Sequence, residues 1–236
     1  MSEISLLALL VCLLPLLGIA RISRRWAGSG GEVPYATGRM LAQLLLVGFV
    51  LVFVFSSPNP LIGLAVVAVM ILASSAIAVR TVERGRMAAF WKAVISIGLV
   101  GGLVLVFILY GVLRLSNPLY QPRMMIPLAG MIFSNAMTAI TLAEERLQRE
   151  EDAGLSYPEA RSAAWTAALI PQINALFAVG IVSLPGMMTG QILSGVDPLI
   201  AVRYQIVVMA MVLQAAGYGV AMFLWLSRPK AVRNSG

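Results

Sequence analysis

AEERLQREEDAGLSYPEARSAAWTAAL, residues 143–169, is the one strongly polar stretch in an otherwise apolar chain. It holds six of the ten carboxylates of the chain together with three arginines: Glu144, Glu145, Glu150, Glu151, Asp152 and Glu159, with Arg146, Arg149 and Arg161. Apolar runs that could cross a bilayer precede and follow it. The stretch is therefore expected as a cytoplasmic loop between two membrane spans. A membrane protein with one elaborated polar loop is expected to use it to meet a soluble partner.

The composition of the whole chain indicates an all-α integral membrane protein. Of 236 residues, 60% are hydrophobic and only 11% are charged, with a mean hydropathy of +0.91. A soluble domain of this size needs more charge to cover its surface. Several apolar runs approach the roughly 20 residues that span a bilayer as a helix. The alternation of polar and apolar residues that marks a membrane barrel is absent from the sequence.

The net charge of +7 does not predict nucleic acid as a partner. The basic residues cluster at the ends of apolar runs, where the positive-inside rule places them, so the expected partner is the lipid bilayer. The single cysteine, Cys12, allows neither an internal disulfide nor a cysteine metal cluster. The sequence also has no histidine, which removes the commonest metal ligand and the commonest general base.

The hydrophobic pattern predicts one transmembrane domain over residues 1–236. It contains about seven spans, at residues 4–20, 38–55, 61–79, 93–113, 124–142, 170–194 and 202–226. The first run is long for a signal peptide and follows an acidic start, so we interpret it as a true span. The turn at Ser57–Pro60 and the helix-start pair Asp197-Pro198 support the neighbouring ends. The sixth span is the least regular, because prolines and glycines interrupt it.

Lysine and arginine counts predict the orientation. Loops rich in lysine and arginine, such as those after the first and third spans, alternate with loops that contain few basic residues. This places the N-terminus outside and both the polar loop and the C-terminus in the cytoplasm, as a multi-pass protein of the inner (plasma) membrane.

The polar loop carries its own helix-start signal. Ser156-Tyr157-Pro158-Glu159 matches a capping box, in which the side chains of residues 156 and 159 bind each other's backbone N–H. Gly154 allows a sharp reversal just before it. An alanine-rich helix from Tyr157 through Ala168 is expected to lead directly into the sixth span. Two interpretations stay open: a docking site for a partner, or a solvated loop with an interfacial helix.

Missing groups narrow the mechanism. No carboxylate lies at predicted membrane depth, whereas proton-coupled carriers usually have one. The sequence has no phosphate-binding Gly-x-x-x-x-Gly-Lys-Ser/Thr loop. If transport is active, its energy is expected to come from another polypeptide. No residue is predicted to catalyse a covalent reaction.

Polar and soft side chains within the spans are candidates for a transport path. Gln43 and Asn135 are amides in apolar runs, which either line a path or join helices by hydrogen bonds. Met131 and Met187 are thioethers, which either suit soft ions or supply adaptable packing. Pro185, Gly186 and Gly190 offer a hinge or, alternatively, close helix packing. These residues alone identify no metal ligands.

Several stretches resemble the permease subunits of the FetB-type ABC transporters, the bacterial iron-export family with a plant branch linked to aluminium tolerance. The most specific is Leu184-Pro185-Gly186-Met187-Met188-x-Gly190. The matching stretches are GRMLAQLLLVG (38–48), IPLAGMI (126–132), NAM (135–137), VSLPGMMTG (182–190), GVDP (195–198) and RYQ (203–205). Residues before about 35 carry little of the resemblance.

The resemblance implies a homodimer of permeases joined to two copies of an ATP-binding cassette subunit. ATP and Mg would bind in that partner, with no cofactor in this chain. The segment from Gly154 to Trp165 would work as the coupling helix, so Gly154, Ser156, Glu159 and Arg161 are the expected coupling residues. Iron-like cargo rests on this resemblance alone. The rival interpretations are a self-sufficient secondary carrier or channel, and a membrane scaffold.

Overall fold

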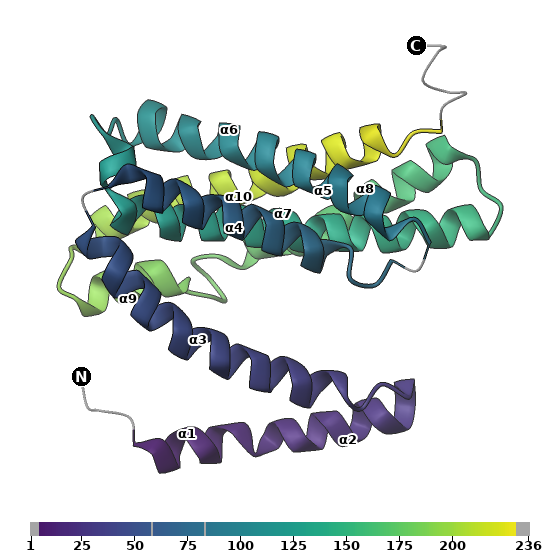
Figure 1. The fold of residues 1–236 in the computed structure, drawn as a ribbon, viewed down its shortest axis with the longest axis horizontal. Helices are drawn as coiled ribbons and strands as arrows, with labels where there is room; N and C mark the ends of the chain where they lie inside the picture. Colours follow the sequence, from purple (N-terminus) through teal and green to yellow (C-terminus); the bar gives the residue numbers. More distant parts are fainter. Residues whose placement is uncertain (1–4, 58, 83, 230–236) are drawn as a thin grey trace. The chain divides into compact units, whose positions relative to one another are not determined.

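The computed structural model describes residues 5–57, 59–82 and 84–229. Over these residues the chain is helical, and an isolated bridge between Val179 and Ser183 is the one β contact among them. The chain forms two compact units, one ending at Ser57 and one beginning at Pro58. Figure 1 shows the course of the helices in each.

The first unit is a helical hairpin. Helices α1 (Leu6–Leu13) and α2 (Pro15–Ala27) follow each other almost without a break, and α3 (Glu32–Ser56) packs on α2. Gly28, at a φ of +69°, occupies the left-handed conformation that ends α2. The unit contains two of the candidate membrane helices, Leu7–Ala27 and Glu32–Ser56. They overlap the first two predicted spans.

The second unit is a helical bundle built around α7. Its first helices are α4 (Pro60–Ala78) and a rod from Arg86 to Val112. The rod consists of α5 (Arg86–Ile95), η1 (Ser96–Val100), α6 (Gly101–Val106) and η2 (Phe107–Val112). There follow η3 (Pro118–Tyr120), α7 (Pro122–Asp152), α8 (Tyr157–Ala178), α9 (Gly186–Leu193) and α10 (Pro198–Leu226). Helix α7 packs against α4, α6, α8 and α10.

Small side chains allow these helices to approach closely. Ala160, Ala164 and Ala168 repeat every four residues on α8 and are fully buried. Helix α7 contributes a similar row, and on α10 a Cβ added at Gly219 would lie 3.6 Å from the Cβ of Ala136. Close packing of this kind holds membrane helices together where lipid supplies no hydrophobic driving force. The alanine-rich segment is therefore part of the core.

The structure does not confirm the predicted number of seven spans. Six helices among the described residues are long and apolar enough to cross a membrane. The segment predicted as the sixth span, 170–194, is not one helix, because α8 ends at Ala178 and α9 begins only at Gly186. Gly180 adopts a φ of +82°, and Pro185 has no N–H and disfavours a helical residue before it.

The structure also corrects the predicted loop 143–169. Helix α7 continues to Asp152, so only residues 153–156 form a turn. The high charge of this segment suggested a loop, but the charged side chains pair along the helix. Arg146 binds Glu150 and Arg149 binds Glu145, each at 2.6 Å. Such i,i+4 pairs favour a helix. The predicted helix does begin at Tyr157, and it runs unbroken past Ala168 to Ala178.

Replacing Gly101 with alanine tests the packing of α6 on α7. A Cβ at this position would lie 2.9 Å from Phe133 Cε1 and 3.1 Å from Ile132 Cγ2. We expect a loss of about 1–3 kcal/mol of stability, measured by denaturation in detergent. The matched control is Gly102→Ala, whose Cβ would meet nothing within 4 Å and which gains up to about 1 kcal/mol from helix propensity. Equal stability of the two variants would refute the close approach.

Candidate functional site

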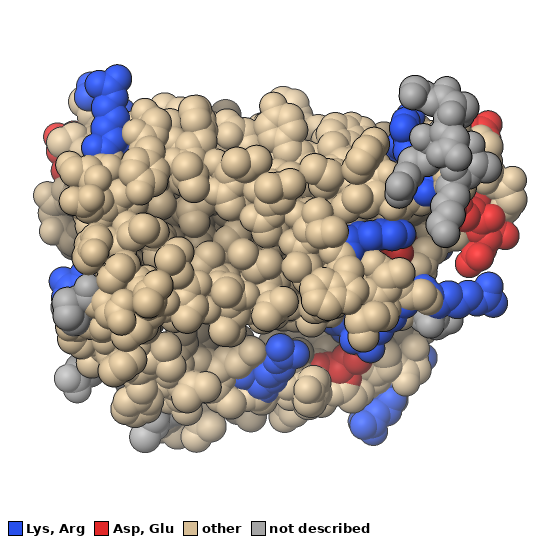
Figure 2. Space-filling view, turned by 45° about the horizontal axis from the view of Figure 1, so that its top comes forward, with Lys and Arg blue, Asp and Glu red and all other residues tan. Residues whose placement is uncertain are grey.

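Charged residues gather at one end of the second unit, which we call the charged end. It comprises Thr81, Val82 and Arg84 before α5, the end of α7, the turn 153–156, the start of α8 and the end of α10. Figure 2 shows a broad uncharged surface across the upper middle of the view, with basic and acidic side chains at its left and right edges. This distribution is typical of a protein whose middle lies in lipid and whose charged end lies in water.

The turn at the charged end is held by hydrogen bonds. Glu159 Oε2 accepts hydrogen bonds from the N–H of Ser156 at 3.0 Å and from its hydroxyl at 2.5 Å, and the predicted capping box is present. Gly154 has a φ of +89°, in the region that favours glycine. Leu155, between them, keeps 40% of its surface exposed. The turn therefore presents an apolar side chain on a fixed, polar support.

The capping box predicts a local dependence on pH. The hydroxyl and then the N–H of Ser156 hold the pKa of the Glu159 carboxyl below its ordinary value. A lowered pKa in the folded state means that the stabilisation is present above the ordinary value of 4.5 and is lost as the pH falls through the folded pKa. We expect the protection factors for hydrogen exchange, which correct for the slower intrinsic exchange in acid, to fall in the first turn of α8 below pH 4.5. Glu159→Gln should remove this pH dependence, and unchanged protection factors in the wild type would contradict it.

A polar groove of about 590 Å³ lies beside the turn. It runs between the loop before α5 and the end of α7, and its lining residues are Thr81, Val82, Arg84, Glu144, Glu145, Gln148, Arg149, Glu151 and Asp152. Glu144 is only 8% exposed, accepts from Gln148 Nε2 at 2.9 Å and interacts electrostatically with Lys92. The groove thus joins two chain segments far apart in sequence, and its lining carries four carboxylates against two arginines, of which Arg149 pairs with Glu145.

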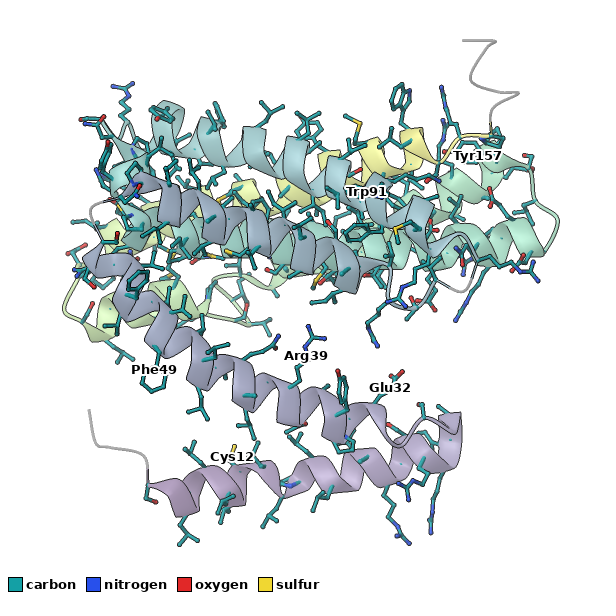
Figure 3. All side chains as sticks on the ribbon, in the orientation of Figure 1. Cys12, Glu32, Arg39, Phe49, Trp91 and Tyr157 are labelled. Carbon is teal, nitrogen blue, oxygen red and sulfur yellow. The ribbon has the colours of Figure 1, made fainter. Side chains whose placement is uncertain are left out.

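Tyr157 ties the start of α8 to the end of α10. Its buried hydroxyl donates to the carbonyl of Leu224 in the last turn of α10, which also accepts the N–H of the C-cap residue Ser227 at 3.1 Å. Figure 3 labels Tyr157 at this junction. Burial raises the pKa of Tyr157, and the guanidinium groups of Arg161 and Arg228 partly offset that rise. The tyrosine therefore stays protonated and remains a donor.

Removing this hydroxyl should destabilise the charged end. In Tyr157→Phe the carbonyl of Leu224 loses the phenol as a donor and keeps only the N–H of Ser227, which costs about 0.5–1.5 kcal/mol. We expect lower thermal stability in detergent and faster hydrogen exchange at the start of α8. Tyr120→Phe, an exposed tyrosine of η3, is the control and should change neither. Wild-type behaviour of Tyr157→Phe would mean that the bond does not hold the junction.

The structure brings together two of the predicted path residues and adds one that the sequence analysis missed. Asn135 Nδ2 donates to the carbonyl of Met131 at 2.8 Å, one turn earlier on α7. Asn135 Oδ1 accepts from Nε2 of Gln172 on α8 at 3.4 Å. Gln172 is 8% exposed. The signal that could have found it is the same as for Asn135, an amide within an apolar helix.

The other predicted path residues lie elsewhere. Gln43 is exposed on α3 in the first unit, and Met187 is half-buried on α9. The neighbouring Met188, rather than Met187, lines an apolar groove of about 520 Å³ between the end of α8, α9 and α10. Gln205 of α10 also lines that groove; it is 5% exposed, and its Oε1 has no partner among the described residues. Gln205 belongs to one of the stretches that carry the family resemblance, but the sequence analysis did not predict it as a site residue.

The hinge candidates stand at the break in the helix. Pro185 precedes α9, while Gly186 and Gly190 lie on it. A Cβ added at either glycine would meet nothing within 4 Å. Close packing within this chain therefore does not require glycine there. The described residues contain no group of three His, Cys, Asp or Glu side chains that could hold a metal ion.

Comparisons with known proteins identify relatives along almost the whole chain. The model of a family described as "Uncharacterised protein family (UPF0014)" matches residues 3–232. "UPF0014 membrane protein slr1647" of Synechocystis is 36% identical, covering 85% of this chain and 84% of that protein. "Probable iron export permease protein FetB" of Escherichia coli is 34% identical, with 84% and 81% covered. "Protein ALUMINUM SENSITIVE 3" of Arabidopsis thaliana is 32% identical, with 79% and 72% covered. No solved structure matches.

Proposed function

The chain belongs to the UPF0014 family of membrane proteins, and on that premise we propose that it is the membrane-spanning subunit of an ABC transporter that exports an iron-like metal ion. ATP, with Mg, would be hydrolysed by a separate ATP-binding cassette subunit. The proposal takes its cargo from the name of the Escherichia coli relative, a probable iron export permease. The observation that carries the role of a driven subunit is the rigid, polar turn between α7 and α8.

The turn has the properties expected of a coupling element. Leu155 stands exposed within a charged rim, and the capping box fixes the start of α8 behind it. Movement of the turn is transmitted to the bundle because α7 and α8 are long, continuous helices packed on each other. Gly154 shapes the turn, Ser156 and Glu159 stiffen it, and Arg161 borders it. An apolar centre surrounded by a polar rim is the usual composition of a protein–protein interface.

The transport path is proposed along the amides of the second unit. Asn135 and Gln172 connect α7 to α8 through one weak hydrogen bond of 3.4 Å, which is easily exchanged for a bond to a passing ligand. Met131 lies one turn from Asn135 and Met187 lies on α9, beside the groove with Gln205. Amide oxygens and thioethers would replace part of the hydration of a metal ion without a fixed charge that traps it. We propose separately that Gln43 of α3 also lines the transport path.

A second copy of the chain is proposed to complete the assembly. The open space beside Gly186 and Gly190 leaves room for another helix to approach the broken segment closely. In that arrangement Pro185 and Gly186 would serve as a hinge where two copies meet. We place the protein in the inner (plasma) membrane with the N-terminus outside and the charged end in the cytoplasm, because basic residues gather at that end.

Co-purification tests the proposed assembly. We would extract the chain in a mild detergent from its native membrane and identify what accompanies it by mass spectrometry. A soluble ATP-binding subunit in equal amount is expected. A known ABC transporter extracted in parallel controls for dissociation. Recovery of this chain alone, with the control intact, would favour the rival interpretation of a self-sufficient secondary carrier or channel.

A further inference from the structure

A small recess of about 260 Å³ lies at the charged end between α8 and α10. Its lining residues are Arg161, Trp165, Ala221, Leu224, Trp225 and Arg228. Helix α8 contributes Arg161 and Trp165, and Trp225 of α10 is joined by Arg228, which follows the end of that helix. The bond from Tyr157 to the carbonyl of Leu224 holds these helices together beside the recess.

Among the described residues neither of the two arginines has an acidic partner. Both side chains are half-buried, and both guanidinium groups are close enough to Tyr157 to affect its phenol. Within the described residues neither guanidinium makes an ion pair or a side-chain hydrogen bond. The nearest carboxylate in sequence, Glu159, is bound to Ser156. Two half-buried cations around one recess leave a site that a bound anion would stabilise.

The two tryptophans indicate where in the membrane the recess lies. Trp165 and Trp225 are exposed, and such side chains concentrate at the level of the lipid headgroups. Apolar side chains of α10, including Ile206, are exposed towards its other end, where lipid tails would cover them. A ligand in the recess would therefore have a charged head beside the arginines and an apolar tail along the helices.

We propose that this recess binds the phosphate headgroup of an anionic phospholipid, held between the guanidinium groups of Arg161 and Arg228 with its glycerol edge against Trp165 and Trp225. Guanidinium groups bind phosphate oxygens in pairs, and the two indole rings cover the apolar part of the headgroup. The net negative charge of the lipid neutralises part of the positive charge of the two arginines. The bound lipid would anchor the start of α8. This proposal does not depend on the existence of an ATP-hydrolysing subunit.

Native mass spectrometry of the delipidated full-length chain tests this proposal. The protein would be offered equimolar phosphatidylglycerol and phosphatidylcholine, and separately inorganic phosphate. We expect a preference of about ten- to thirtyfold for phosphatidylglycerol, the effect of two surface arginines. Arg161→Gln with Arg228→Gln should abolish the preference, and Arg228→Gln alone should lower it by about three- to fivefold. Arg86→Gln removes a charge from the same end without touching the recess and should keep it.

Three results would overturn the proposal. The first is equal retention of the two lipids by the wild-type chain. The second is an unchanged preference in Arg228→Gln, which lies at the end of α10 and is not expected to impair folding. The third is binding of inorganic phosphate in competition with phosphatidylglycerol at equal concentration, which would assign the recess to a free anion.

Discussion

Replacing Leu155 with aspartate is expected to lower ATP hydrolysis by the partner subunit, in its complex with this chain, by about ten- to a hundredfold. Leu155 is the exposed apolar side chain of a turn that the capping box and Gly154 hold rigid. Truncated hot-spot residues typically cost about 2 kcal/mol or more, and each 1.4 kcal/mol is a tenfold change in binding. A buried, unpaired carboxylate adds to this cost. The measurement is ATPase activity of the reconstituted complex against partner concentration.

A matched control separates docking from folding. Leu119→Asp introduces the same change at an exposed leucine of η3, before the start of α7 and therefore far from Asp152 at its end. It should leave ATP hydrolysis unchanged. Both variants should insert into the membrane like the wild type, because neither side chain is part of the core. Equal ATPase activity of Leu155→Asp and wild type would remove the turn from the interface.

Replacing Asn135 with leucine is expected to reduce cation flux at least about tenfold while the complex still assembles. The substitution removes the amide that joins α7 to α8 and leaves the buried Nε2 of Gln172 without its acceptor. An unsatisfied buried group costs about 1–3 kcal/mol, so the helices should settle in a different arrangement around the proposed path. The measurement is cation flux in proteoliposomes, together with the amount of partner bound.

Thr138→Val is the control for that substitution. Thr138 lies on α7 one turn away and is exposed, and its hydroxyl binds only the carbonyl of Ser134 in its own helix. Its replacement removes a polar group of the same helix without breaking a contact between helices, and flux should be kept. Normal flux in Asn135→Leu would restrict Asn135 to joining helices. Loss of assembly in Asn135→Leu would make its role structural.

Local signals in the sequence predicted helix ends well. Asp197 accepts from the N–H groups of Leu199 and Ile200 at the start of α10, as the Asp-Pro pair predicts. Asn59 caps α4 in the same way, and the capping box starts α8 at Tyr157. These signals act over three or four residues, so a single sequence contains all the information they need.

The errors arose where tertiary contacts decide the structure. Residues 143–152 have the charge of a loop, yet their i,i+4 pairs and the buried Glu144 keep them helical on the bundle. The segment 170–194 has the hydropathy of a span, yet Gly180 and Pro185 divide it. The recess of Arg161 and Arg228 and the pair of Asn135 and Gln172 join residues 67 and 37 positions apart. The spacing of residues along a single sequence does not predict that residues so far apart lie close together in the fold.

Reconstitution into proteoliposomes tests the central claim, that this chain conducts a metal ion only when a separate subunit hydrolyses ATP. Liposomes would contain either the chain alone or the chain with the ATP-binding subunit that co-purifies with it, and Fe²⁺ flux would be followed with and without MgATP. The account predicts flux only with both proteins and MgATP, and its loss in Leu155→Asp. Flux through the chain alone, driven by an ion gradient and independent of ATP, would contradict it.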